Sequence, residues 1–311
     1  MDVERLARKL KPLRPKEVGH WLRARDLADP KLRALIDRQI IHTAHEVLGD
    51  FRQKILLSLP PATVAKGPFR LGTVLYEKEK WPAGLSADEL LQGTAIFGRS
   101  GAGKTNAVFH IMRQLVDRRV PFLFLDWKRT ARHLIPEMRS KINIYTPGRS
   151  LSRFPFNPFI PPPGLEAGVY INQVVDVLAD AYTLGDGARS ILQKAITSCM
   201  TGRRTPTIPE VLKAVDEIPG QERVRGWKIS ATRALESLAF ANVAGGDSQE
   251  KLVRTLLDQS TIIELDALSQ SSKKFLIPLI CLWLYSVRLA ARQREHLSLV
   301  IIVEEAHHVL Y

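Results

Sequence analysis

The stretch that decides the fold is Gly98–Thr105, which reads GRSGAGKT. It matches the pattern GxxxxGK[ST] at every fixed position. An apolar run, Thr94–Phe97, precedes it, and a segment with helical apolar spacing, Ala107–Val116, follows it. Glycines let the backbone bend so that successive N–H groups point at phosphate oxygens, and a following helix adds the positive end of its dipole. The sequence therefore predicts a strand, a phosphate-binding loop (P-loop) and a helix, in that order.

This loop carries the residue types that bind a nucleoside triphosphate. We expect the Lys104 ammonium between the β- and γ-phosphates and the Thr105 hydroxyl as a ligand of Mg²⁺. The other expected nucleotide-binding residues are Gly98, Arg99, Ser100, Gly101, Ala102, Gly103 and Asn106. The alternative is a fortuitous glycine-rich turn, which the correct flanking patterns disfavour. The loop predicts nucleotide binding but does not by itself predict hydrolysis.

A second signal comes 200 positions after Lys104, where the apolar run Leu299–Val303 ends in Glu304 and Glu305. In many P-loop ATPases a strand beside the P-loop strand directs one acidic residue towards Mg²⁺, and the next carboxylate polarises the attacking water. By position, Glu304 takes the metal role, and Glu305 joins Lys104 as a catalytic residue. Glutamate replaces the commoner aspartate at the metal position and reaches one methylene farther, as far as a metal-bound water. The alternative is an acidic strand end without catalytic function.

The rest of the chain alternates short apolar runs with helical patterns. Pro121–Leu125, Ile142–Tyr145 and Thr261–Leu265 are further strand candidates. Such alternation is typical of an α/β fold with a parallel sheet covered on both faces. Asp126-Trp127-Lys128 follows one strand, and residues at the carboxyl edge of a parallel sheet face its ligand crevice. A solvated loop is the equally weighted alternative for these three residues.

The helical patterns predict four segments. Residues 1–60 form a helical N-terminal segment, with helix starts at Pro15 and at Asp29-Pro30. Residues 61–165 form the first part of the core. Residues 166–256 form a helical insertion that contains a capping box over Thr207–Glu210. Residues 257–311 form the second part of the core.

Composition and charge restrict the function classes. The 311 residues contain 45 Lys and Arg against 32 Asp and Glu, a net charge of +13, which favours a polyanionic partner such as nucleic acid over a merely solvated basic surface. No apolar stretch approaches the roughly 18 residues that a membrane helix needs. The N-terminus has no apolar run typical of a secretory signal, and two cysteines exclude a disulfide framework. A cytoplasmic location is therefore expected.

Three further groups invite a functional interpretation. His307 and His308 are adjacent, and neighbouring residues on a helix point about 100° apart, so they are expected to chelate one ion poorly. His42 and His45 face together beside Glu46 but have no evident third ligand in the sequence. Arg203-Arg204 lies between two predicted helices, where a solvated loop is preferred over a phosphate contact.

These motifs together resemble the HerA/FtsK superfamily of P-loop motor ATPases, and HerA-like proteins in particular. The resemblance covers residues 70–311 and rests on an ordered set of segments: FGRSGAGKT, FLFLDWK, INIYTPG, FPFNPF, TIIELDALSQ and IIVEEAHHVL. It implies a RecA-like ASCE P-loop NTPase core with a mostly parallel sheet, in which Gly98–Thr105 binds ATP, Glu304 lies at Mg²⁺ and Glu305 activates water. It also implies a ring, a hexamer, that hydrolyses ATP at subunit interfaces, translocates double-stranded DNA as a helicase and works with a nuclease partner.

The sequence departs from this family in three places. Residues 1–60 do not resemble the β-barrel that begins archaeal HerA proteins, and Gly93 stands near where a histidine often precedes the P-loop strand. The sequence stops six residues after Glu305, whereas the family continues with further core strands and arginines, so we expect a fragment. Two alternatives stay open: a conjugation- or secretion-type coupling ATPase, and a nucleotide-binding regulatory subunit of a nuclease complex.

Overall fold

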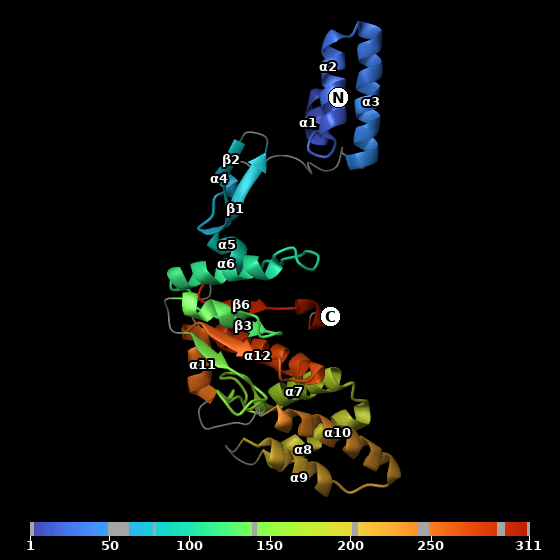
Figure 1. The fold of residues 1–311 in the computed structure, drawn as a ribbon. Coiled ribbons are helices and arrows are strands. Elements are labelled where there is room, and N and C mark those ends of the chain that lie inside the picture. The colour runs from blue at the N-terminus through green and yellow to red at the C-terminus, as the bar shows by residue number, and fades with distance from the viewer. Residues whose placement is uncertain are drawn as a thin grey trace. The chain divides into compact units, whose positions relative to one another are not determined.

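The computed structural model describes residues 3–48, 62–76, 79–138, 142–200, 205–241, 249–290 and 296–309 (Figure 1). The chain divides into two compact units. One comprises residues 1–66 with 73–82, and the other comprises residues 67–72 with 83–311. The residues Arg203-Arg204, which the sequence analysis singled out, lie outside the described residues.

The first unit contains α1 (Val3–Leu10), α2 (Pro15–Leu27) and α3 (Pro30–Leu48), followed by the short α4 (Ala62–Ala65). Pro15 begins α2, and the Asp29 carboxylate accepts the first N–H groups of α3, so both predicted helix starts are confirmed. The buried core of these helices includes Leu10, Val18 and Ile40. Leu32 and Leu35, in the first half of α3, are exposed. The buried core residues of α3, Ile40 and Ala44, lie in its second half.

The second unit is built on a four-stranded sheet in the order β4-β5-β3-β6. Its strands are β3 (Phe122–Asp126), β4 (Asn143–Tyr145), β5 (Thr261–Glu264) and β6 (Val300–Val303), and every pair is parallel. Three of them lie within the predicted apolar runs, and β3 extends one residue past its run, to Asp126. Asp126 is level with Glu264, and Leu125 is level with Val303. The carboxyl ends of β3, β5 and β6 therefore meet at one edge of the sheet.

Side chains that alternate along β3 enter two different cores. Leu123 and Leu125 pack with helices from the C-terminal half, whereas Phe122 and Phe124 pack against α6 (Lys104–Asp117). Figure 1 shows α6 on one side of the sheet and α12 (Gln270–Ala290) with α7 on the other. A fully buried Phe or Leu contributes roughly 1.5–3 kcal/mol relative to an exposed one, so both faces stabilise the sheet. The predicted α/β fold with a covered parallel sheet is confirmed.

Five helices lie between β4 and β5: α7 (Ala167–Tyr182), α8 (Asp186–Cys199), α9 (Ile208–Glu217), α10 (Glu222–Phe240) and α11 (Gln249–Asp258). The Thr207 and Glu210 capping box that opens α9 is confirmed. These helices share one apolar core with a face of the sheet. The division of the chain at residues 60, 165 and 256 stays a prediction.

One predicted strand is wrong. Thr94–Phe97 belongs neither to the four-stranded sheet nor to the small sheet of β1 (Phe69–Tyr76) and β2 (Glu79–Leu85), and Phe97 is 90% exposed. A strand requires a hydrogen-bonded neighbour, and the apolar pattern of these residues does not supply one. The short α5 (Ala87–Leu91) precedes this segment. None of the described helices combines the length and apolar character that crossing a bilayer requires.

Candidate active site

The P-loop is preformed by its own backbone. Gly101 and Gly103 have φ values of 76° and 89°, in the left-handed region that glycine adopts without strain. No side chain caps the start of α6 at Lys104, so its first N–H groups are available to an anion. The Lys104 ammonium lies over the loop and donates to the carbonyl oxygens of Gly98 and Arg99, at 2.8 and 3.1 Å. The predicted nucleotide-binding residues therefore form one continuous, exposed cradle.

A second group of polar side chains lies at the carboxyl edge of the sheet. The fully buried Asp126 carboxylate accepts the N–H groups of Thr130 and Ala131, both at 2.9 Å, and of Lys128 at 3.3 Å. These bonds fold the turn after β3 and begin the 3₁₀ helix η1 (Ala131–Glu137). The Asp126 carboxylate is bound by N–H groups of its own loop, so it stabilises the turn at the site.

Glu304 is bound by the same turn. Its carboxylate accepts the Lys128 N–H and the Thr130 hydroxyl, each at 3.2 Å. Burial raises the pKa of Glu304, and the neighbouring Asp126 carboxylate raises it further. The two acidic groups therefore share one set of donors across adjacent strands.

Glu305 lies in a different environment, although it is the next residue. Its backbone is left-handed, with φ 52° and ψ 41°, and its carboxylate forms an ion pair with the Lys128 ammonium. That hydrogen bond lowers the pKa of Glu305 and raises the pKa of Lys128. The second Glu305 oxygen lies 3.4 Å from Nδ1 of His307. Both glutamates are half-buried, but the pKa of Glu305 is lowered and that of Glu304 is raised.

Sequence reasoning missed Lys273, which is buried on α12. Its ammonium donates to the Trp127 carbonyl oxygen at 3.2 Å and lies 4.4 Å from the centroid of the Trp127 ring. Burial lowers the pKa of Lys273. One signal for it was in the sequence: Lys273 shares a helical stripe with the apolar residues Leu276, Ile277 and Ile280, where a solvated lysine is not expected.

Arginines neutralise the remaining acids at this edge. Arg132 donates to both oxygens of the buried Glu264, at 2.6 and 2.8 Å. Arg149 forms an ion pair with Asp266. The partners of Glu305, Lys128 and His307, are both exposed, as are the arginines that pair with Glu264 and Asp266.

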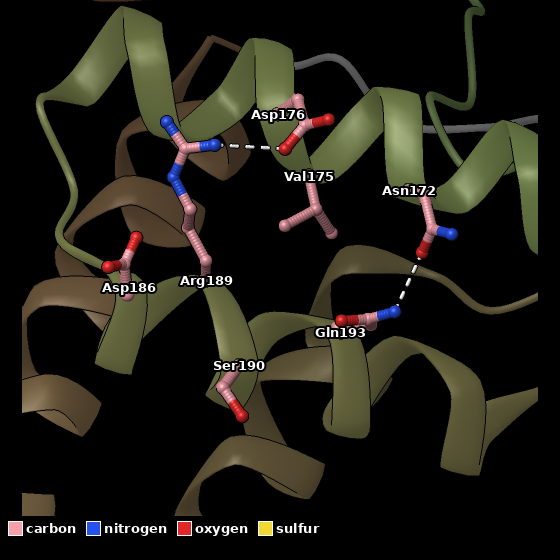
Figure 2. A pocket seen from close by; sticks show the side chains of 7 residues that line it. All are labelled: Asn172, Val175, Asp176, Asp186, Arg189, Ser190 and Gln193. Carbon is pink, nitrogen blue, oxygen red and sulfur yellow. Dashed lines mark hydrogen bonds and ion pairs between the residues drawn. The ribbon is translucent and has the colours of Figure 1, made fainter.

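The structure brings Glu304 and Glu305 together with residues 126–130. Within the described residues, no hydrogen bond or ion pair joins residues 98–106 to either glutamate. A separate hollow of about 420 Å³ lies between α7 and α8 (Figure 2). There Arg189 pairs with Asp176 and Asp180, and Asn172 with Gln193, so these polar groups bind one another. The roles predicted for the P-loop residues and for Glu304 and Glu305 stay predictions.

Comparison with protein families identifies one match. The family profile described as "Helicase HerA, central domain" matches residues 69–282, which is more than half of the chain. This range contains the P-loop, β3, β5 and most of α12. A search of curated proteins found no match to this chain.

Solved structures resemble the fold at low sequence identity. The plasmid coupling protein TrwB in complex with the non-hydrolysable ATP analogue ADPNP is 13% identical, with 68% of this chain and 56% of that chain covered and a TM-score of 0.51. TrwB in complex with ADP and Mg²⁺ is 12% identical, with 66% of this chain and 61% of that chain covered and a TM-score of 0.46. VirB4 of Thermoanaerobacter pseudethanolicus is 12% identical, with 78% of this chain and 68% of that chain covered and a TM-score of 0.49. The chain spans less than two thirds of the TrwB chain. The predicted RecA-like P-loop NTPase fold is confirmed.

Proposed function

Because this chain belongs to the HerA helicase central-domain family and is a P-loop ATPase of the HerA/FtsK type, we propose that it hydrolyses MgATP to translocate double-stranded DNA. The observation that carries the proposal is the pairing of a complete P-loop with two consecutive glutamates at a strand end of the sheet. The net charge of +13 supports a partner with a phosphate backbone.

Nucleotide binding is assigned to residues 98–106. The N–H groups at the start of α6 and the Lys104 ammonium would hold the phosphates, and Lys104 would exchange the carbonyl oxygens of its own loop for phosphate oxygens. Thr105 and Glu304 would hold Mg²⁺, since hydroxyl and carboxylate oxygens are the hard donors that this ion prefers. The ion would neutralise charge on the phosphates.

Hydrolysis is assigned to Glu305. An ionised carboxylate can accept a hydrogen bond from water and polarise it for attack. The Lys128 ion pair keeps Glu305 ionised but weakens it as a base, because the ammonium stabilises the charged form. Glu305 would therefore become a stronger base when it leaves Lys128 for the attacking water.

The decisive experiment measures ATP hydrolysis and DNA movement together. We expect double-stranded DNA to stimulate phosphate release and the protein to displace a triplex-forming strand from a duplex. Lys104→Ala and Glu305→Gln should both abolish this, whereas Glu250→Gln, an equivalent change at an exposed helix position, should not. DNA translocation without ATP hydrolysis, or a rate of ATP hydrolysis that double-stranded DNA does not change, would overturn the motor proposal.

Oligomeric state is a separate part of the proposal. We expect a homo-oligomeric ring, a hexamer, with nucleotide at subunit interfaces, as the family resemblance implies, and a nuclease as the second partner. Native mass spectrometry with and without an ATP analogue would show six copies if this is correct. A monomer under all nucleotide conditions would exclude interface hydrolysis by this chain.

One observation favours the regulatory alternative, in which nucleotide binding matters more than turnover. The carboxylate proposed to activate water is already bound by Lys128. If Glu305→Gln leaves the biological activity intact while Lys104→Ala abolishes it, the chain acts as a nucleotide-binding subunit.

A further inference from the structure

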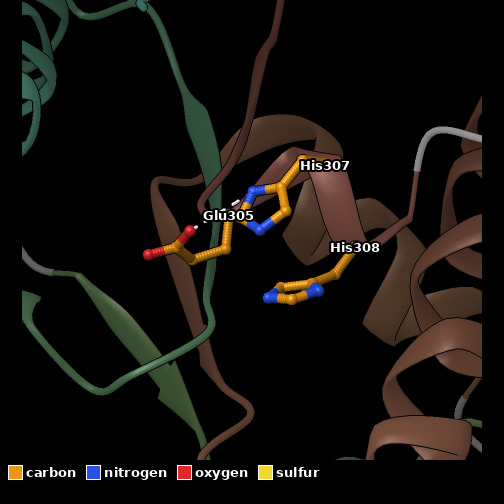
Figure 3. A group of neighbouring side chains, drawn as sticks. All are labelled: Glu305, His307 and His308. Atoms are coloured by element: carbon orange, nitrogen blue, oxygen red, sulfur yellow. Dashed lines mark ion pairs between the residues drawn. The ribbon is translucent and has the colours of Figure 1, made fainter. Parts of the chain in front are cut away.

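The turn after β6 brings three ligand-type side chains to one place. Glu305 has a left-handed backbone, and the three residues that follow form η2 (Ala306–His308), a single 3₁₀ turn. The expectation that His307 and His308 point apart is wrong here, because one short turn does not hold their rings on a helical surface. Their ring centroids lie 4.0 Å apart with an interplanar angle of 40°. Figure 3 shows both imidazoles on the same side as the Glu305 carboxylate.

The distances between the ligand atoms fit a metal ion. One atom each from Glu305, His307 and His308 lies within 4.8 Å of the other two, and Glu305 Oε2 is 3.4 Å from His307 Nδ1. Zinc binds nitrogen and oxygen at about 2.0–2.2 Å in tetrahedral sites, which places two ligand atoms about 3.4 Å apart. The Glu305 and His307 atoms already have this separation. A ring nitrogen of His308 lies within 4.8 Å of both.

Neighbouring residues hold two of the three side chains in place. Trp127 stacks on His308 with centroids 5.0 Å apart and an interplanar angle of 18°, and the ammonium of the buried Lys273 lies 4.4 Å from the centroid of the Trp127 ring. Lys128 binds Glu305 Oε1, which leaves Oε2 directed at His307. Partners of this kind orient metal ligands in proteins and raise metal affinity.

We propose that Glu305, His307 and His308 form a binding site for a divalent transition-metal ion of the Zn²⁺ class. Two imidazoles and one carboxylate favour Zn²⁺, Co²⁺ or Ni²⁺ over Mg²⁺ and Ca²⁺, which prefer oxygen ligands. The His307 side chain is 61% exposed, so the ion and its remaining water ligands have access. This site is separate from the Mg²⁺ position assigned to Thr105 and Glu304.

The site has a regulatory consequence that rests on the proposed function. A metal ion bound to Glu305 occupies the carboxylate that would accept a hydrogen bond from the attacking water. Zn²⁺ should then inhibit ATP hydrolysis without preventing ATP binding at residues 98–106. Metal binding does not depend on whether Glu305 activates water. The metal site and its effect on ATP hydrolysis can therefore be tested separately.

The test is a titration of the untagged chain with Co²⁺, read by the d–d absorption of the bound ion, followed by displacement with Zn²⁺. We expect one Co²⁺ per chain. His307→Ala and His308→Ala should each weaken binding at least about tenfold, the lower end of what even outer-shell changes cost. His42→Ala is the matched control, because His42 is an exposed histidine 3.3 Å from a carboxylate of Glu46, on α3.

The result that would overturn the proposal is equally direct. If the intact chain takes up no Co²⁺ or Zn²⁺, or if His42→Ala weakens binding as much as His308→Ala, the site does not exist. Circular dichroism of each variant checks that the fold is retained, which we expect because His307 is exposed. ATP binding, measured on the same samples, separates a failed metal site from a failed nucleotide site.

Discussion

The P-loop and the carboxyl edge of the sheet are built in opposite ways. The P-loop comes from eight consecutive residues, is exposed, and makes its side-chain hydrogen bonds within itself. The carboxyl edge collects residues 126–132, 264–273 and 304–308, and its central groups, Asp126 and Glu264, are buried. One site depends on local backbone geometry, and the other depends on three strands being in register.

This difference separates function from stability. A change in the P-loop removes a ligand contact but leaves no buried polar group without a partner. A change at the carboxyl edge leaves buried donors unpaired, which costs far more folding free energy. Four predictions test this division, from the largest expected effect to the smallest.

Lys104→Ala should abolish activity without destabilising the fold. Among the described residues, the ammonium donates to the carbonyl oxygens of Gly98 and Arg99 in its own exposed loop. We expect phosphate release to fall at least about 100-fold, since a lost electrostatic contact to a reacting group has that effect. The unfolding free energy should stay within about 0.5 kcal/mol, as for ordinary surface substitutions. A large loss of unfolding free energy in urea denaturation would show that Lys104 also stabilises the fold outside its own loop.

Asp126→Ala should show the reverse pattern. The substitution removes the acceptor of the half-buried Thr130 N–H group and of the buried Ala131 N–H group. We expect a loss of about 3 kcal/mol in unfolding free energy, which chemical denaturation measures. Asp126→Asn retains one acceptor oxygen and should cost less. Equal stability of the alanine variant and the unchanged protein would show that this turn does not need the carboxylate.

Glu304 and Glu305 should respond to pH in opposite directions. The pKa of Glu304 is raised in the folded chain, so its stabilising contribution is complete below the ordinary glutamate pKa and is lost as pH rises through the folded value. The pKa of Glu305 is lowered, so its contribution is present above the ordinary value and is lost as pH falls through the folded one.

The measurement compares unfolding free energy against pH for the unchanged chain, Glu304→Gln and Glu305→Gln. As pH rises from acid, the unfolding free energy of the unchanged chain relative to Glu304→Gln should fall. Its unfolding free energy relative to Glu305→Gln should increase. Slopes of the same sign would contradict the opposite pKa shifts of the two glutamates.

Lys128→Met should have only a small effect on stability. Its ion pair with Glu305 is largely exposed, and such pairs contribute about 0.2–1 kcal/mol. The pKa of Glu305 should rise towards its ordinary range. A double-mutant cycle with Glu305→Gln isolates the pair, and a coupling energy of several kcal/mol would place the pair in a buried environment instead.

The sequence was sufficient for features that depend on neighbouring residues. The P-loop motif, the helix starts at Pro15 and Asp29-Pro30, and the capping box at Thr207 are all local. Continuous apolar runs identified all four strands of the sheet, because strands buried on both faces contain few polar residues.

Features that depend on distant partners were not predictable. Thr94–Phe97 has a strand-like pattern but no hydrogen-bonded neighbour in either sheet. The burial of Lys273 against Trp127 joins α12 to the residue after β3, a contact between segments 146 positions apart. The convergence of His307 and His308 depends on a turn whose length the helical pattern did not reveal.

The most direct test of the central claim is a single-turnover assay of Glu305→Gln with radiolabelled ATP and double-stranded DNA, with nucleotide binding measured on the same sample. If Glu305 activates the attacking water, the variant should bind ATP as tightly as the unchanged chain and release phosphate at least about 100-fold more slowly. An unchanged rate of phosphate release would contradict the assignment of hydrolysis to this glutamate.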